Sequence, residues 1–158
     1  MGETVAILRD RFPEAIVESH AHRGDETVVV RPEALREVAT FLHDDPELGF
    51  EVLMDVTAVD YLRRKPRFEV VYHFLSHRRR ERLRLKVAVD GKEPVVASVQ
   101  DLWVSANWYE REVWDMYGIR FDGHPDLRRL LMYDEFTGHP LRKDYRVDKR
   151  QPLVGPVN

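Results

Sequence analysis

The spacing of apolar residues predicts two amphipathic helices in the first 45 residues. Residues 3–12 carry apolar side chains at near-helical spacing and end at Pro13, and Pro32 suits the first turn of a second helix that ends at Asp44. The second helix has an apolar stripe at i, i+3, i+4 and i+7, formed by Leu35, Val38, Ala39 and Leu42. Each helix therefore has one face suited to packing against a sheet.

Apolar and polar residues alternate in the segments that we assign to strands. Residues 15–21 and 26–31 are two short strands on either side of Gly24, which suits a tight hairpin turn. Three further strands follow, with inward-facing positions Phe50, Val52, Met54 and Val56; Phe68, Val70, Tyr72 and Phe74; and Leu83, Leu85, Val87 and Val89. Short turns at residues 63–66 and 77–80 make these three strands an antiparallel meander.

This order of elements predicts an α+β fold. The chain reads helix-strand-strand-helix-strand-strand-strand, which indicates a two-layer domain with a mixed, mostly antiparallel sheet and both helices on one sheet face. A further helix and an extended C-terminal arm follow. We expect residues 1–97 to form the α+β core, and residues 98–158 to form the helix and an irregular docking arm of the same single domain.

The pattern changes after Pro94. Ser98 and Asn107, each followed three residues later by an acidic residue, look like successive helix starts, and Gly118 supplies the stop for the second helix. On that helix, one stripe consists of Tyr109, Val113 and Met116, while the residues that point elsewhere are Arg111, Glu112 and Asp115. From Ile119 onward prolines and glycines interrupt the periodicity, so we expect an ordered but irregular arm that a partner fixes fully.

Charge is unevenly distributed along the 158 residues, although the net charge is only −3. Residues 61–86 carry 10 Lys or Arg against 2 Asp or Glu, an excess that nucleic-acid-binding surfaces share. Because basic residues alternate with apolar ones in its second half, we interpret this run as the outer face of one strand, either solvated or facing a partner.

Composition excludes several kinds of chemistry. Cysteine is absent, so the chain has no disulfide, no iron–sulfur ligation of its own and no cysteine nucleophile. No apolar run approaches the roughly 20 residues of a membrane span, and the N-terminus lacks the basic start and apolar core of a signal peptide. We therefore expect a cytoplasmic location.

Candidate catalytic and metal-binding residues are few. Two pairs of histidines could be metal ligands, His20 with His22 and His124 with His139. His20 and His22 project to one side of a strand and could begin a zinc site, but no third ligand follows at a recognisable spacing. No serine lies in a Gly-x-Ser-x-Gly elbow, and no glycines form a phosphate-binding loop. A stand-alone metal hydrolase and a nucleic-acid-binding module are the less favoured hypotheses.

The carboxylates of the third helix have two possible roles, one catalytic and one structural. Glu110, Glu112 and Asp115 could supply a general acid and base, and Glu112 and Asp115 are neighbours on a helix. Arg111 and Arg128 are available to keep these carboxylates ionised, so we favour a salt-bridged structure or interface.

Residues 106–145 combine charge, aromatic side chains and two Gly-His-Pro blocks. Proline disfavours the helical region for His124 and His139, and the preceding glycines permit tight bends, so each block is predicted to be an extended elbow. Each elbow is followed by a leucine and basic side chains, a pattern suited to a partner surface that carries carboxylates.

The segment contains a series of motifs at fixed spacing, which are Glu110-Arg111-Glu112, Asp115, Met116-Tyr117-Gly118-Ile119, His124-Pro125, Arg128-Arg129 and Gly138-His139-Pro140-Leu141-Arg142-Lys143-Asp144-Tyr145. With these motifs it resembles the C-type, or 30 kDa, subunit family of the bacterial respiratory NADH:quinone oxidoreductase, complex I. The resemblance covers about a quarter of the chain by direct motif, and the order of elements elsewhere is compatible with it.

The resemblance implies a cofactor-free structural or assembly subunit of the hydrophilic peripheral arm of the complex, with no catalytic or metal-binding residues. A protein of this kind docks on the D-type subunit near the quinone site, also contacts the B-type and I-type subunits, and supports electron transfer from NADH to quinone. Partner subunits then bind NADH, FMN, iron–sulfur clusters and quinone. Membrane association arises only through the complex, on the cytoplasmic side of the bacterial inner membrane.

The resemblance also implies interface residues. A charge network that orients the helix is assigned to Glu110, Arg111, Glu112 and Asp115. Docking is assigned to His124, Arg128, Arg129, His139, Arg142, Lys143, Asp144 and Tyr145. Related subunits occur in membrane-bound hydrogenases and in other complex I-like dehydrogenases, which stay an alternative.

Overall fold

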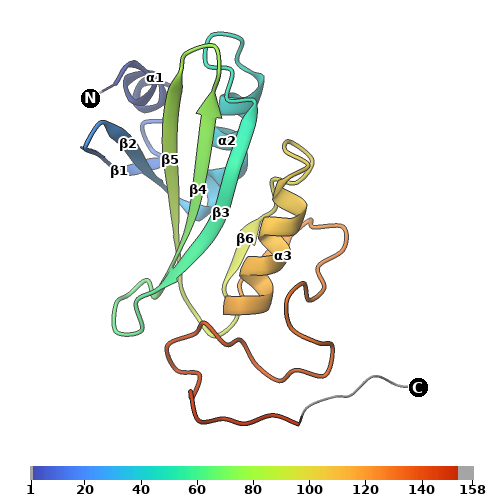
Figure 1. Ribbon diagram of the computed structural model, residues 1–158. Helices are drawn as coiled ribbons and strands as arrows, with labels where there is room; N and C mark the ends of the chain where they lie inside the picture. Colours follow the sequence, from blue (N-terminus) through green and yellow to red (C-terminus); the bar gives the residue numbers. More distant parts are fainter. Residues whose placement is uncertain (1, 153–158) are drawn as a thin grey trace.

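Five strands form a mixed sheet in the order β1-β2-β5-β4-β3 (Figure 1). In this computed structural model, which describes residues 2–152, the elements in chain order are α1 (Glu3–Arg11), β1 (Ile16–His22), β2 (Asp25–Val30), a 3-10 turn η1 (Pro32–Ala34), α2 (Leu35–Asp44), β3 (Val52–Asp60), β4 (Phe68–Ser76), β5 (Glu81–Val89), β6 (Val95–Ala97), α3 (Ala106–Tyr117) and β7 (Arg120–Asp122). Strands β2 and β5 pair in parallel, and the other three pairs of the sheet are antiparallel. The predicted α+β fold with a mixed, mostly antiparallel sheet is confirmed.

The first two strands form the predicted hairpin. Its turn residues Arg23 and Gly24 have φ angles of 53° and 91°, the positive values that a tight two-residue connection needs if it is to match the strand twist. Helix α2 then carries the chain across the sheet, so that the meander of β3, β4 and β5 returns to the centre and places β5 beside β2.

One apolar core holds the N-terminal helices to the sheet. The predicted stripe of α2 is fully buried, and Val5 and Leu8 of α1 are buried with it. These side chains belong to the same cluster as the inward residues of β4 and β5, among them Tyr72 and Leu85. Burying large aliphatic and aromatic side chains contributes about 1.5–3 kcal/mol each, so this core is the main source of stability.

The predicted inward positions of β3 are wrong in part. A β-bulge between Leu53 and Asp55 interrupts the pairing with β4. An extra residue reverses the alternation, so Leu53 faces the core with 3% exposure whereas Met54 is 39% exposed. The expected position Val56 remains buried beyond the bulge.

The segment after β6 differs from the expectation. No helix begins at Ser98, and residues 98–105 contain only turns and irregular backbone before the single helix α3. The short parallel pair of β6 with β7 was not predicted. Gly118 ends α3 with φ 74°, a left-handed conformation that glycine adopts without strain, as predicted.

Residues 123–152, called the arm below, contain no helix or strand. Figure 1 shows the arm, in orange to red, passing along α3 and then beneath the lower end of the sheet. The expectation of an irregular arm is confirmed for these residues, and the expectation that a partner fixes the arm fully stays a prediction. Within residues 2–152, no helix has the length and apolar character that crossing a membrane requires.

The basic run of residues 61–86 is not one strand face. Only Arg82, Arg84 and Lys86 lie on β5, where they are partly or fully exposed. The other seven basic residues lie in the β3–β4 and β4–β5 connections. The interpretation as a single strand face is therefore wrong for most of the run.

Candidate docking interface

Glu110 is fully buried and ties α3 to the segment before it. Its Oε2 accepts a hydrogen bond from the Ser98 hydroxyl at 2.6 Å, and its Oε1 accepts one from the Val99 N–H at 2.8 Å. Burial, the largest cause, raises the pKa of Glu110 to about 7. The predicted pairing of Glu110 with Asn107 at a helix start is absent, because this carboxylate binds the preceding segment instead.

Asp115 is the carboxylate that fixes the first half of the arm. Its side chain has no exposed surface and pairs with Arg129 Nη1 at 2.6 Å. Its Oδ2 also accepts three successive backbone N–H groups, from Leu130 at 3.0 Å, Leu131 at 2.8 Å and Met132 at 2.9 Å. Burial opposes the charged form, but these donors together lower the pKa of Asp115.

The arginine partners differ from the prediction. Arg129, not Arg128, pairs with Asp115. Arg111 lies on the same helix, but its Nε and Nη2 donate to the carbonyls of Arg128 at 3.2 Å and Arg129 at 3.0 Å. Sequence spacing could not choose between two adjacent arginines on a segment without periodicity.

His139 fixes the next part of the arm against the end of α3. Its Nδ1 lies 2.9 Å from the Asp115 carbonyl, and burial lowers its pKa. A Cβ added to Gly118 would lie 2.6 Å from the imidazole, so Gly118 serves both the helix end and this close approach. The carbonyls of Phe136 and Gly138 accept from Arg129 Nη2 at 2.7 and 3.1 Å.

Asp60 is a second buried carboxylate, and sequence reasoning missed it. It ends β3 with no exposed side-chain surface and pairs with Arg67 Nη2 at 2.7 Å. The hydrogen bonds from Arg67, the largest cause, hold its pKa well below the usual range. Asp60 also accepts the Lys143 N–H at 2.8 Å, and Arg67 pairs with Asp144 at 2.9 Å. An aspartate at an inward strand position after Val56 and Ala58 was the available signal.

The remaining arm residues have mixed exposure. Arg142 lies over the Phe68 ring at 5.0 Å and donates to the Tyr117 carbonyl. Tyr145 stacks on Phe136 with ring centroids 6.0 Å apart. Lys143 is exposed, and half of the Asp144 side chain is open to solvent. This part of the arm therefore combines internal anchors with one exposed cation, Lys143, that makes no ion pair among the described residues.

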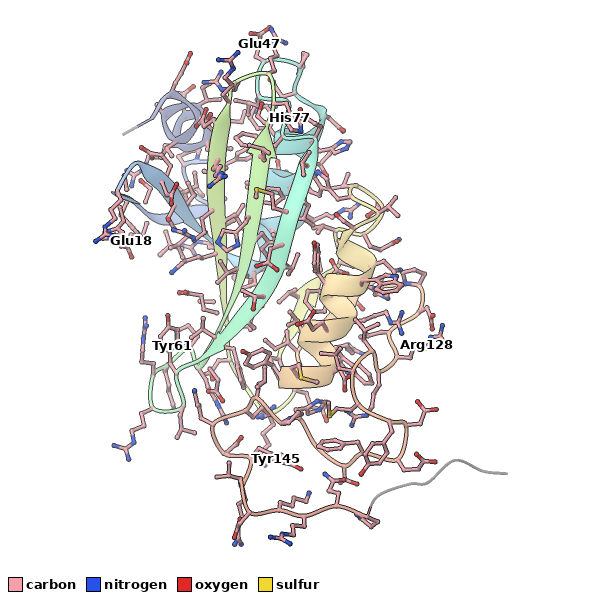
Figure 2. All side chains as sticks on the ribbon, viewed as in Figure 1. Glu18, Glu47, Tyr61, His77, Arg128 and Tyr145 are labelled. Atoms are coloured by element: carbon pink, nitrogen blue, oxygen red, sulfur yellow. The ribbon has the colours of Figure 1, made fainter. Side chains whose placement is uncertain are left out.

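Two of the predicted interface residues, one on α3 and one on the arm beside it, are exposed to solvent. Glu112 is exposed, and the Arg128 side chain is 71% exposed and pairs only with its neighbour Asp126 at 2.9 Å among the described residues. Figure 2 shows Arg128 pointing away from α3. His124 is half-buried, with Nε2 3.0 Å from the Asn107 carbonyl.

Apolar side chains accompany these charges. Trp108 is 65% exposed on α3 and Leu131 is 57% exposed on the arm, whereas Trp103 is buried and donates its Nε1–H to the Phe50 carbonyl. Exposed tryptophan and arginine are the residue types that anchor protein interfaces. The arrangement can therefore recognise a polypeptide surface through ring contacts and charge-assisted hydrogen bonds.

The histidines predicted as possible metal ligands are not joined by further ligands. Within residues 2–152, no three or more His, Asp or Glu side chains converge as a metal site would require. His20, one of the candidate ligands, lies 3.6 Å from Glu18 on the exposed edge strand β1.

The sequence of this chain matches that of known proteins. The family model described as respiratory-chain NADH dehydrogenase, 30 kDa subunit, matches residues 28–151. The C-type subunit of NADH-quinone oxidoreductase from Roseiflexus sp. (strain RS-1) is 55% identical over 137 residues, which cover 87% of this chain and 79% of the relative. The corresponding subunit of Geotalea uraniireducens (strain Rf4) is 47% identical over 155 residues, which cover 98% and 90%.

Solved structures show the same fold. A trypsin-resistant fragment of Nqo5 aligns with a TM-score of 0.69 at 33% identity, over 78% of this chain and 98% of the fragment. A chain of the membrane-bound sulfane sulfur reductase, an archaeal respiratory membrane complex, aligns with a TM-score of 0.76 over 92% of this chain and 85% of that chain. At 23% identity, the second likeness shows the fold alone.

Proposed function

The chain belongs to the 30 kDa subunit family of respiratory-chain NADH dehydrogenase, and we propose that it is a structural subunit of the hydrophilic peripheral arm of complex I. In this role it docks on the D-type subunit near the quinone site, with further contacts to the B-type and I-type subunits. It attaches to the cytoplasmic side of the bacterial inner membrane only through the complex.

The main support for this proposal is that one side of the arm is bound to the rest of the chain while the other side is exposed. Its inner side is fixed by the buried carboxylate Asp115, which holds Arg129 and three backbone N–H groups. Its outer side leaves Arg128 and Leu131 exposed next to α3. A segment that is already ordered loses little conformational entropy on binding, so such an arm is suited to docking.

The proposed contribution to electron transfer is positional. NADH, FMN, iron–sulfur clusters and quinone are assigned to partner subunits, and this chain stabilises the arrangement of those subunits. Within the chain, Arg111 and Asp115 hold the arm against α3, and Glu110 holds α3 to the segment before it. The exposed members of the interface set contact the partner. The exposed members are Glu112, Arg128, Lys143 and Asp144.

Arg128→Glu tests this proposal by reversing one exposed charge. Charge reversal at a docked position costs about 2–5 kcal/mol, so the Kd for the purified D-type subunit should rise at least about tenfold. The measurement is titration of labelled chain with that subunit. The matched control Arg128→Lys keeps the charge but loses the planar guanidinium, so its Kd should rise less than that of Arg128→Glu.

Folding of the variant must be checked in parallel. Because Arg128 is 71% exposed and pairs only with Asp126 among the described residues, its replacement should change the free energy of unfolding by no more than about 0.5 kcal/mol. A folded Arg128→Glu chain that binds the D-type subunit with parental affinity would contradict docking through this side of α3.

A further inference from the structure

Two leucine-plus-basic segments, about 80 positions apart in the sequence, meet at one end of the molecule. The first is Leu62-Arg63-Arg64-Lys65 in the β3–β4 connection, and the second is Leu141-Arg142-Lys143 in the arm. Asp60 joins them, because its carboxylate accepts the N–H of Leu62 at 2.8 Å and the N–H of Lys143 at 2.8 Å. Together, residues 62–65 and 141–143 are called the basic pole below.

Contacts around Tyr61 give the first segment a defined shape. The Tyr61 N–H donates to the Arg67 carbonyl at 3.0 Å, and its hydroxyl donates to Glu69 at 3.3 Å. The guanidinium of Arg64 lies 4.1 Å from the centre of the Tyr61 ring. Figure 2 shows Tyr61 and Tyr145 at the same end of the molecule, which agrees with the hydrogen bond from Lys143 to Asp60. The basic pole is therefore ordered before any partner binds.

The positive charge of the basic pole is not neutralised by the rest of the chain. Residues 60–67 and 141–145 contain six Lys or Arg and only two carboxylates, Asp60 and Asp144, and Arg67 pairs with both carboxylates. The four remaining exposed cations make no ion pair with any residue of 2–152, and they are Arg63, Arg64, Lys65 and Lys143. This excess stands out on a chain whose net charge is −3.

Exposed leucines lie within the same surface. Leu62 is 44% exposed and Leu141 is 49% exposed. An apolar side chain next to unpaired guanidinium groups fits a polypeptide that carries both carboxylates and apolar residues. The Tyr61 ring, the aromatic side chain of this connection, is covered on one side by Arg64, so it offers a poor stacking platform for single-stranded nucleic acid.

We propose that the basic pole docks an acidic segment of a neighbouring subunit, whose Asp or Glu carboxylates pair with Arg63, Arg64, Lys65 and Lys143. This inference rests on the proposed function, because it needs a complex in which this chain has a neighbour. It defines a contact region separate from the Arg128 side of α3, and it names the chemistry of the partner segment.

Zero-length carbodiimide cross-linking of the intact purified complex tests the proposal. The reagent joins an ammonium to a carboxylate only when the two groups lie within ion-pair distance. Lys65 has no carboxylate partner among the described residues, so a Lys65 cross-link would have to come from another polypeptide. Lys86 lies 2.8 Å from Glu69 and provides an internal reaction that should occur both in the complex and in the isolated chain.

The expected result is a Lys65 cross-link to an Asp or Glu of another subunit, identified by peptide mass spectrometry. Lys65→Arg should abolish this product and leave the Lys86–Glu69 product unchanged.

Arg63→Glu with Arg64→Glu should lower the salt concentration at which the chain leaves the complex by at least about twofold. The control pair Arg63→Lys with Arg64→Lys should leave that concentration unchanged.

Three outcomes would overturn the proposal, and they are distinguishable. If the complex contains this chain but Lys65 reacts with an amine reagent as fast as in the isolated chain, the basic pole is free and this inference alone fails. If Lys65 is protected from the amine reagent only until lipid is removed, and gives no cross-link to a carboxylate, the basic pole binds lipid headgroups instead. If the chain does not co-purify with other subunits, the proposed function fails together with this inference.

Discussion

Different interactions stabilise two parts of the molecule, the sheet with helices α1 and α2 and the arm that lies against α3. In the sheet, fully buried apolar side chains such as Leu85 and Phe74 fill one core. In the second region, buried carboxylates bind backbone N–H groups and arginines across 14 to 17 residues of sequence. Apolar burial is non-directional, whereas a carboxylate with three or four donors specifies one course of the backbone.

The difference shows how a segment without a regular pattern of apolar residues can be held in one conformation. The arm offers no apolar stripe to pack, and its backbone polar groups need partners. Asp115 supplies three of these partners at once, and Asp60 supplies one more at Lys143. Loss of one carboxylate should therefore affect the arm locally, while loss of one core side chain should affect the whole fold.

Phe74→Ala should give the largest loss of stability. Phe74 is 1% exposed, and its ring centroid lies 4.9 Å from that of Trp103, so the truncation leaves a cavity that costs about 3–5 kcal/mol. Urea unfolding followed by tryptophan fluorescence measures this loss. Val59→Ala on the same sheet, at a 37% exposed position, should cost less than about 1 kcal/mol. A similar cost for both variants would refute a core-dominated sheet.

Asp115→Asn should act mainly on the arm. Asn keeps the shape and one acceptor but leaves Arg129 buried without its charge partner, a change that costs about 3 kcal/mol. Hydrogen exchange at the amides of residues 130–132 should accelerate at least about tenfold, because their opening free energy falls by more than about 1.4 kcal/mol, while amides of β4 change little. The exposed Glu112→Gln on the same helix is the control. Equal acceleration in β4 would show that the two regions open as one unit.

Glu110→Gln should change how the free energy of unfolding depends on pH. The folded chain holds a proton on Glu110 up to about pH 7, whereas the unfolded chain releases it near the ordinary glutamate pKa of 4.5. The folded state therefore binds more protons in this interval, and the free energy of unfolding falls as pH rises from about 4.5 to about 7, by at most about 3 kcal/mol.

The Gln variant should lack this fall, and the difference between parent and variant should be constant above about pH 7. Thermal unfolding at pH 5, 6, 7 and 8 measures the difference. The half-buried His139, whose pKa is lowered by burial, contributes a slope of opposite sign in both proteins and cancels in the comparison. A constant difference from pH 5 to pH 8 would mean that Glu110 is already ionised in the folded chain at pH 5.

Much of the sheet was determined by the sequence alone. Alternating apolar residues at β4 and β5 and the stripe of α2 place their side chains in the core regardless of what lies elsewhere, because each pattern has only one face that can be buried. The bulge at Leu53 was an exception, since one inserted residue reverses the alternation without changing composition. The resemblance in residues 106–145 similarly identified the family before any contact was known.

The tertiary structure decided which charged groups are buried and which are free. Nothing in the spacing separates Arg128 from Arg129, yet one is 71% and the other 13% exposed, because only Arg129 reaches Asp115. The meeting of the β3–β4 connection with the arm depends on Asp60, which accepts the N–H groups of Leu62 and Lys143, about 80 residues apart. Local sequence determines local periodicity, but a long-range hydrogen bond depends on where the folded chain places both of its partners.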